Sequence, residues 1–409
     1  MRELPLQTMT DIPDKRFTPP PPASAGGFAW FYSPKLRGYI SQLIVLLLLV
    51  WGLYEIIGNT QANLKKLNQK FGFDFLTQAA GFDISSSLIE YSSNSNYGRA
   101  IVAGLLNTVL VAVLGIFFAT IVGFTVGVMR LSKNKVVAGA ATLYVELLRN
   151  IPLLLQIFMW YALVLKPLPG VKDAYSFFGS IFISKKGILL PHPNFGPGAW
   201  MALAALAVAL IGTWWFRKQA WKRQDETGQI TPVWLISIPI IVLSPFFGLL
   251  FAGWPLTFDF PELKGFNFAG GMTMVPEMLA LLIALIFYSA TFIAETVRGG
   301  IQAVSHGQSE ASSALGLSRG MALRLVVIPQ AMRIIIPPLA SQYLNLTKNS
   351  SLAIAIGFPD LMYAGGTVNN QSGKAIEVVF ILMVVYLSLS LLTAAFMNWF
   401  NSRMKLVER

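Results

Sequence analysis

Polar side chains that can bind a charged solute lie close together in one apolar stretch, residues 331–357. They are Asn345, Lys348, Asn349, Ser350 and Ser351, with Thr347 between them. A lysine or an amide N–H can bind a carboxylate, whereas an amide oxygen can accept a hydrogen bond from an ammonium group. This stretch also contains Pro337 and Pro338, and it predicts a broken or cavity-lining helix whose polar cluster lines a binding cavity. The alternative is that the cluster caps the broken helix and bonds a partner subunit.

Charged residues form two pairs with a spacing of three residues in other apolar stretches. Glu146 and Arg149 lie in one of them, and Glu295 and Arg298 in another. Because this spacing places both members on one helix face and charges in lipid are costly, each pair is either a structural ion pair or part of a pathway mouth. For Glu295, a contact with a solute ammonium group and a capping role are further alternatives.

Two further residues follow the first charged pair. Pro152 loosens a helix where a gate can bend, and Gln156 lies one turn deeper. The Gln156 amide can meet a solute or bond a neighbouring helix. We expect no catalytic residue, no metal and no cofactor in this chain, because it has no cysteine, only two histidines, and no glycine-rich phosphate-binding motif.

The composition places these residues in a membrane protein. Of the 409 residues, 55% are hydrophobic and only 12% are charged, against about a quarter charged in soluble domains. A membrane span needs about 20 apolar residues. We therefore predict an all-α integral membrane fold with about eight spans, which are residues 40–58, 101–128, 138–165, 199–216, 232–252, 277–298, 331–357 and 376–399.

The distribution of charge predicts the orientation of these spans. The net charge is +12, and most lysines and arginines lie in alternate links, so both termini and residues 299–330 are expected in the cytoplasm. Residues 1–39 contain Pro19–Pro22 and are expected to form an extended cytoplasmic tail rather than a secretory signal.

The spans and the links between them divide the chain into four parts. The predicted parts are the tail at 1–39, a membrane helix with an outer segment at 40–100, the main membrane domain at 101–399, and a cytoplasmic end at 400–409. The main domain carries an insertion at about 166–276 that contains a helical hairpin at 199–252. No internal repeat and no soluble domain are predicted.

Residues 305–330 form a polar link with few residues suited to insertion into lipid. Ser305 or Ser309 can cap a helix, Glu310 favours its positive end, and Gly316 suits the left-handed position that ends it. A second short helix then begins at Ser318 and runs to Pro329. Small residues lie between Glu310 and Gly316, and they allow another protein to approach closely. The alternative is an ordinary loop lying on the membrane.

Five segments together carry a resemblance to a known family. They are Leu105–Val109, Tyr144–Gln156, Phe292–Ile301, Ser309–Gly316 followed by Ile328-Pro329, and Asn345–Leu352. In this order they resemble the polar-amino-acid (histidine/glutamine-type) permeases of ABC importers, over roughly residues 100–165 and 285–399. The departures are Ser312 where the family motif has alanine and Val326 where isoleucine is commoner. The extra first span and the inserted hairpin resemble the larger membrane subunit of general L-amino-acid transporters.

The resemblance implies a type I ABC importer permease that carries amino acids by alternating access. In this family the motif that Ser309–Gly316 resembles is called the EAA loop. The resemblance implies that this loop forms a helix that couples the chain to a separate ATPase. The residues assigned to this role are Ser309, Glu310, Ala311, Ser312, Ala314, Gly316 and Pro329. The implied partners are two ATPase subunits that bind ATP and Mg, a second homologous permease and a periplasmic amino-acid-binding protein, at the bacterial inner membrane. An ion-coupled secondary transporter and a membrane scaffold are the alternatives.

Overall fold

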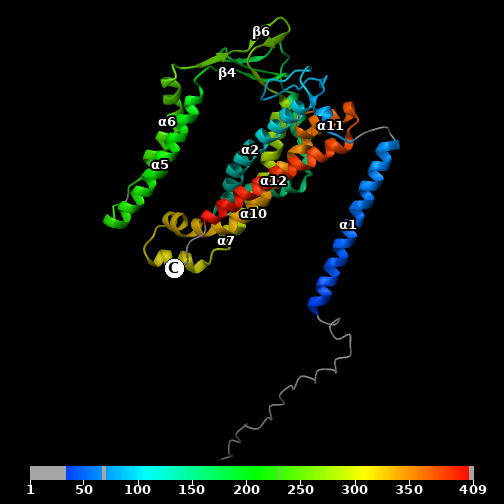
Figure 1. Cartoon of the computed structure of the whole chain (residues 1–409). Helices are drawn as coiled ribbons and strands as arrows, with labels where there is room; N and C mark the ends of the chain where they lie inside the picture. Colours follow the sequence, from blue (N-terminus) through cyan, green and yellow to red (C-terminus); the bar gives the residue numbers. More distant parts are fainter. Residues whose placement is uncertain (1–33, 67–70, 230, 405–409) are drawn as a thin grey trace, which may run out of the picture. The chain divides into compact units, whose positions relative to one another are not determined.

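The computed structural model describes residues 34–66, 71–229 and 231–404 (Figure 1). The chain divides into two units, Met1–Gly72 and Phe73–Arg409. The first unit contains α1 (Pro34–Lys66), whose apolar window has none of its residues buried by this chain. Most of the tail predicted at residues 1–39 lies outside the described residues, and the described helix begins at Pro34.

The second unit is built on helices that overlap the predicted spans, together with α11 (Leu361–Ser372), which no predicted span covers. These are α2 (Tyr97–Met129), α3 (Lys135–Asn150), α4 (Leu153–Leu165), α5 (Trp200–Thr227), α6 (Val233–Phe251), α7 (Pro276–Gln302), α10 (Ile328–Asn349), α11 (Leu361–Ser372) and α12 (Ala375–Met404). The described helices include seven that can cross a membrane, and the bent α3–α4 pair raises this to eight. The structure is 71% helical, so the prediction of about eight spans in a helical membrane fold is confirmed.

Close contact between α2 and α7 depends on glycine. A Cβ added at Gly123 would lie 2.6 Å from Ile293, and one added at Gly127 would lie 2.8 Å from the Ala294 carbonyl oxygen. These distances leave no room for a side chain. Without a hydrophobic force between helices in lipid, small residues favour association because they let backbones approach closely.

The span predicted at 138–165 is not one straight helix. The helices α3 and α4 meet at an angle of 108° across Ile151 and Pro152. Proline has no backbone N–H and its ring clashes with the preceding turn, so Pro152 ends α3 rather than merely loosening it. The predicted span at 138–165 is therefore a bent pair of helices, and the bend lies at the predicted proline.

The break predicted within 331–357 lies nearer the C-terminal end than Pro337 and Pro338. Both prolines lie inside the helix α10, and the α-helical geometry changes to a 3₁₀ helix only at Ser350–Ile356. Gly357 then adopts a φ of 77° and ends the element. The 3₁₀ segment therefore coincides with the serines of the predicted polar cluster.

The segment before α2 packs against the C-terminal helices. The 3₁₀ turn Asp74–Thr77 buries Phe75 in a core that also contains Leu361 and Val378. The buried side chain of Asn107 donates to the carbonyls of Ser86 (2.7 Å) and Pro359 (2.8 Å). Residues 73–96 therefore belong to the main unit, whereas the sequence grouped them with the first span.

Asp360 lies between the last two spans and is completely buried. Its carboxylate caps α11 by accepting from the Tyr363 N–H at 2.8 Å, and the Tyr386 hydroxyl lies 3.5 Å away. Burial raises the pKa of Asp360 from 3.8 to about 7.

A raised carboxyl pKa makes the stability of the fold depend on pH. The folded state holds this proton more tightly than the unfolded state, so stability should fall as the pH rises from about 4 to about 7. Asp360→Asn keeps a capping oxygen and removes the buried charge, so its melting temperature should exceed that of the unmodified chain at pH 8 and lose this pH dependence. Thermal unfolding at pH 5 and pH 8 measures this, and equal pH dependence in both proteins would contradict it.

The segments that flank the inserted α5–α6 hairpin, residues 166–199 and 252–275, contain strands that the sequence did not predict. The strands are β1 (Tyr175–Phe177), β2 (Ile181–Ser184), β3 (Gly187–Leu190), β4 (His192–Phe195), β5 (Leu256–Asp259), β6 (Glu262–Lys264), β7 (Asn267–Ala269) and β8 (Met272–Met274). An antiparallel sheet has the order β1-β2-β3-β8, and β4–β5 and β6–β7 form two-stranded pairs. The strands before α5 pair with strands after α6, so the two ends of the insertion are tied together (Figure 1).

Candidate functional site: the coupling helix and the polar face of α10

The predicted EAA loop, Ser309–Gly316, forms a short helix with a well-defined end. This helix, α8, covers His306–Ala314. Gly316 has a φ of 74°, its N–H bonds the Ser313 carbonyl at 3.0 Å, and the Leu317 N–H bonds the Ser312 carbonyl at 3.1 Å. This pair of bonds is the Schellman ending, in which a left-handed glycine satisfies the last carbonyls of a helix. The predicted helix end at Gly316 is therefore present.

One face of α8 is held by the rest of the chain. The Ser312 side chain is 3% exposed and donates to the Gln308 carbonyl at 2.6 Å. Gln330, at the start of α10, donates to the Gln308 side chain at 3.2 Å. Ser312, a departure from the family motif, is thus the member of the predicted set that is buried. Its hydroxyl is satisfied within the helix.

The opposite face of α8 is open. Glu310 is exposed and lies 3.0 Å from His306, an ion pair when the imidazole is protonated. Ala311 and Ala314 are exposed, and Leu315 is 81% exposed. Ser305 occupies the capping position, but its side chain makes no capping bond. Leu315 was not among the predicted residues; its position directly before the helix-ending glycine was the signal.

The link from α8 to α10 contains no break at Pro329. The helix α9 (Arg319–Ala322) begins at Ser318, whose hydroxyl accepts from the Met321 N–H at 3.4 Å. A π-helical segment, Leu323–Val327, then leads into α10, where Pro329 occupies the first turn and needs no N–H partner. Residues 315–318 between α8 and α9 are not helical, whereas the chain is helical from Arg319 into α10.

The four predicted charged residues do not form two separate pairs. Glu295 pairs with Arg298, as predicted, but it also accepts a hydrogen bond from Arg130 at the end of α2. Glu146 lies 4.0 Å from Arg130 rather than pairing with Arg149, whose guanidinium lies 5.0 Å from the Phe292 ring centroid. Of the two alternatives for Glu146 and Arg149, the ion pair between them is not formed, and a place at a pathway mouth stays a prediction.

Arg130 was missed because its partners are distant in sequence. Its side chain is only 10% exposed, and it joins α2 to α7 and approaches α3. Arg130 lies just after the span predicted at 101–128, in a basic link whose cations indicated only the orientation of the spans. The resulting network of Arg130, Glu146, Glu295 and Arg298 connects three helices close to the end of α7 from which α8 follows.

The predicted polar cluster divides into an exposed and a buried part. Asn345 and Lys348 are exposed and lie on one side of α10 with Ser341, with i, i+4 and i+7 spacing. Ser350 is 1% exposed and donates to the Thr347 carbonyl at 2.8 Å, whereas Ser351 donates to the Lys348 carbonyl at 2.7 Å. Asn349 is half-buried. The serines therefore support the helix end, and Asn345 and Lys348 remain open to a ligand or partner.

Gln156 is a structural residue in this arrangement. It is fully buried, and its side-chain nitrogen donates to the carbonyls of Leu148 at 2.7 Å and Ile151 at 2.9 Å. These carbonyls lie on the α3 side of the break at Pro152, where the regular helical bonds are lost. Of the two alternatives, bonding within the protein is the observed one, so Gln156 fixes the bend and does not face a solute.

Comparison with known proteins identifies the family of this chain. It is 51% identical over 379 residues to the general L-amino acid transport system permease protein AapQ of Rhizobium johnstonii, covering 92% of this chain and 94% of the relative. The chain belongs to the amino-acid permeases of ABC importers.

Other comparisons match this amino-acid ABC permease over long segments. Residues 227–406 match the family described as binding-protein-dependent transport system inner membrane component. The chain is 41% identical to the glutamate/glutamine/aspartate/asparagine transport system permease protein BztB of Rhodobacter capsulatus, over 95% of the chain and 99% of the relative. A solved structure entitled "Crystal structure of an amino acid ABC transporter with histidines" aligns over 75% of this chain and 95% of that chain, with 20% identity and a TM-score of 0.45.

The family assignment decides between the functions that the sequence left open. The chain is a multi-pass membrane transport component, and the predicted resemblance to amino-acid ABC permeases is confirmed. The ion-coupled secondary transporter has no support among these relatives. The coverage of the first relative includes the inserted α5–α6 region, so the insertion is shared rather than peculiar to this amino-acid ABC permease.

Proposed function

We propose that this permease forms the pathway of an ATP-driven, binding-protein-dependent importer of L-amino acids at the bacterial inner membrane. The observation that carries the proposal is the exposed, well-terminated α8, which a short turn at residues 315–318 and a helical segment at 319–327 join to α10, whose open face bears Asn345 and Lys348. A displacement of α8 by an ATPase would therefore move α10 and with it Asn345 and Lys348, whose side chains can bind the charged groups of an amino acid.

We infer the partners from the exposed surfaces of this chain and from the energy source that it lacks. A separate ATPase that binds ATP and Mg supplies the energy and docks on α8, with both termini and α8 in the cytoplasm. A second, homologous permease faces the polar side of α10 and completes the pathway. A periplasmic binding protein delivers the amino acid to the outer β-strands.

The proposed transport cycle uses two arrangements of the helices. ATP binding closes the ATPase pair and favours the outward-open state, and hydrolysis resets it. By linkage, the loaded binding protein must favour ATP closure to the same degree in binding terms. The network of Arg130, Glu146, Glu295 and Arg298 lies between α2, α3 and α7. A switch between the two arrangements would change the packing of these helices and so the contacts of the network.

We assign the amino-acid contact on this chain to Asn345 and Lys348. Lys348 would bind the carboxylate, and the Asn345 oxygen would accept from the ammonium group. A charge-assisted hydrogen bond contributes about 1.5–3 kcal/mol, so Asn345→Ala or Lys348→Ala should raise the substrate concentration for half-maximal uptake by about tenfold. Uptake of labelled amino acids into vesicles containing the assembled transporter measures this.

Two exposed residues on other helices serve as matched controls. Asn370 lies on α11, and Lys135 is the first residue of α3. The variants Asn370→Ala and Lys135→Ala should leave the dependence of uptake on substrate concentration unchanged. All four variants must assemble and hydrolyse ATP. Unchanged uptake of every amino acid tested in the Asn345 and Lys348 variants would remove this face from the pathway.

The proposed function itself is tested by reconstitution with the ATPase and binding protein. Amino-acid-stimulated ATP hydrolysis and uptake are the expected results. Assembly without either activity would support the membrane-scaffold alternative, and uptake that persists without the ATPase would support an ion-coupled transporter.

A further inference from the structure

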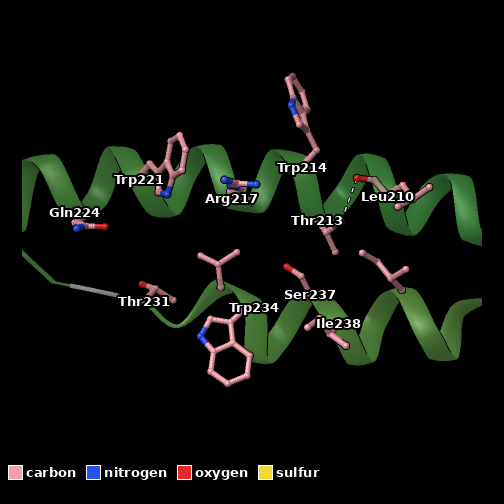
Figure 2. A pocket seen from close by; sticks show the side chains of 12 residues that line it. Leu210, Thr213, Trp214, Arg217, Trp221, Gln224, Thr231, Trp234, Ser237 and Ile238 are labelled. Carbon is pink, nitrogen blue, oxygen red and sulfur yellow. Dashed lines mark hydrogen bonds between the residues drawn. The ribbon is translucent and has the colours of Figure 1, made fainter. Parts of the chain in front are cut away.

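The inserted helices α5 and α6 border a groove lined partly by polar residues, whereas the rest of this helix pair is mainly apolar. The groove has a volume of about 670 Å³ and lies between the C-terminal part of α5 and the N-terminal part of α6. Its polar lining residues are Thr213, Arg217, Gln224, Thr231 and Ser237. Figure 2 shows Arg217 on one of the two helices that border the groove and Ser237 on the other.

Tryptophans place this groove at a membrane interface. Trp200 and Trp254 mark one end of the helix pair, and Trp214, Trp221 and Trp234 line the groove near the other. From Trp234 to the end of α6 at Phe251 the helical rise gives about 26 Å, close to the thickness of about 30 Å of the hydrocarbon core. Tryptophan is enriched where hydrocarbon meets head groups, so Arg217 and Ser237 lie at head-group depth.

Arg217 in the groove and the adjacent Lys218 carry positive charge that no carboxylate of the described residues neutralises. The Arg217 guanidinium lies 4.7 Å from the Trp221 ring centroid, and the Lys218 ammonium lies 5.8 Å from that of Trp214. Within the described part of the chain, neither cation has a carboxylate at salt-bridge distance, whereas Lys222 lies 3.9 Å from Glu226. Arg217 therefore offers a planar set of donors that suits a phosphate.

Ser237 provides a second, independent indication of a ligand. Its hydroxyl oxygen is shielded from solvent and has no hydrogen-bond partner among the described residues. A buried hydroxyl without a partner costs about 1–3 kcal/mol, and serine in a helix usually bonds a preceding carbonyl. Ser237 and Arg217 both line the groove, and a rotation of the serine side chain would turn its hydroxyl toward an anion bound by Arg217.

A second groove of the same helix pair provides a contrast. It has a volume of about 500 Å³, no charged residue among those that line it, and a lining that is almost wholly apolar, including Val208, Leu243 and Phe247. Packing of α5 on α6 thus does not by itself create a polar groove. The basic groove is a local feature of the end that contains Arg217.

We propose that the basic groove between α5 and α6 binds the head group of an anionic phospholipid. Basic pockets between membrane helices on the cytoplasmic side are suited to phospholipid head groups. α5 and α7 run in the same direction because α6 returns between them, so the groove opens on the side of the membrane where α8 lies. The bound lipid fills the space between two helices whose apolar windows are each only 6% buried within the chain.

Lipid retention by the full chain tests this proposal. The protein is placed in nanodiscs of phosphatidylethanolamine with a minor fraction of phosphatidylglycerol, re-extracted, and its bound lipids are counted by native mass spectrometry. Phosphatidylglycerol should be enriched over phosphatidylethanolamine on the unmodified chain. Arg217→Gln should lower this enrichment about tenfold, the loss expected for one charge-assisted bond, and Ser237→Ala should lower it to a smaller extent.

A matched variant separates a specific site from general charge attraction. Arg223→Gln removes the same charge from the same helix, at a residue that does not line the groove, and should retain the phosphatidylglycerol. Equal losses in the Arg217 and Arg223 variants, or no enrichment in the unmodified chain, would overturn the proposal. Displacement of the lipid by inorganic phosphate alone would assign the site to a free anion and also overturn it.

The absence of cysteine allows a second measurement. A single-cysteine variant, Ser237→Cys, can be labelled with a spin probe, and relaxation by a nickel-chelating lipid reports its proximity to head groups. Strong relaxation is expected at position 237. Crosslinking of the same cysteine to a partner subunit in the assembled transporter would show a protein occupant and contradict the lipid assignment.

Discussion

Replacement of Gly316 by valine is expected to uncouple ATP hydrolysis from amino-acid uptake. Gly316 has a φ of 74°, and a Cβ there would meet no atom within 4 Å, so the penalty is conformational rather than steric crowding. A left-handed conformation costs about 1–2 kcal/mol for an ordinary residue and is least accessible to a β-branched one. Valine should therefore unwind the end of α8 and displace Leu315, and uptake should fall at least about tenfold at near-normal ATP hydrolysis.

Gly320→Val is the matched control for this change. Gly320 lies in α9, has no positive φ, and also has no atom within 4 Å of an added Cβ, so this variant should keep uptake coupled to hydrolysis. Glu310→Lys reverses an exposed charge on α8 and should uncouple in the same way while the binding protein still docks. Normal coupling in both the Gly316 and the Glu310 variants would show that α8 is not the ATPase socket.

Glu295→Gln is expected to lower the stability of the permease and to change its conformational equilibrium. Glu295 is the shared partner of Arg130 and Arg298, and the Arg130 side chain is only 10% exposed. Removing one member of a buried pair leaves an uncompensated charge. Since Glu295 is 32% exposed, solvent offsets part of this cost, and we expect a loss of about 2 kcal/mol. Thermal unfolding of the purified protein measures it.

A double-mutant cycle separates the Arg130–Glu295 contact from general effects of charge. Arg130→Gln and Glu295→Gln together should cost less than the sum of the single changes, because the second change then removes no remaining contact. Lys133→Gln removes a nearby exposed charge and should be neutral. Additive losses in the cycle would mean that the contact contributes nothing to stability.

The order of the helices and the end of α8 were predictable from local sequence. The apolar stretches are long enough to identify the spans, because lipid forces each backbone polar group to bond within its own segment. The glycine at 316 predicted the end of α8, because few other residues adopt a positive φ without strain. The quoted motifs also identified the permease family before the comparisons confirmed it.

The partners of the charged residues depended on tertiary structure. Glu295 and Arg130 are separated by 165 residues, and nothing in the local pattern distinguishes Arg130 from other cations in basic links. The local spacing predicted Glu146 with Arg149, but packing placed Arg149 over Phe292 and Glu146 near Arg130. An i, i+3 spacing permits a pair, and the neighbouring helices decide whether it forms.

The sequence by itself determined the membrane class of this chain, its number of apolar segments, its family and the end of α8, since all of these are written in short-range patterns of hydrophobicity, charge and glycine. The tertiary structure decided the 108° bend at Pro152, the β-strand pairing that closes the insertion, and which face of α10 remains open. It also brought Arg217 and Ser237 to one groove from two helices. These features arise from contacts between distant residues, whose geometry no local pattern specifies.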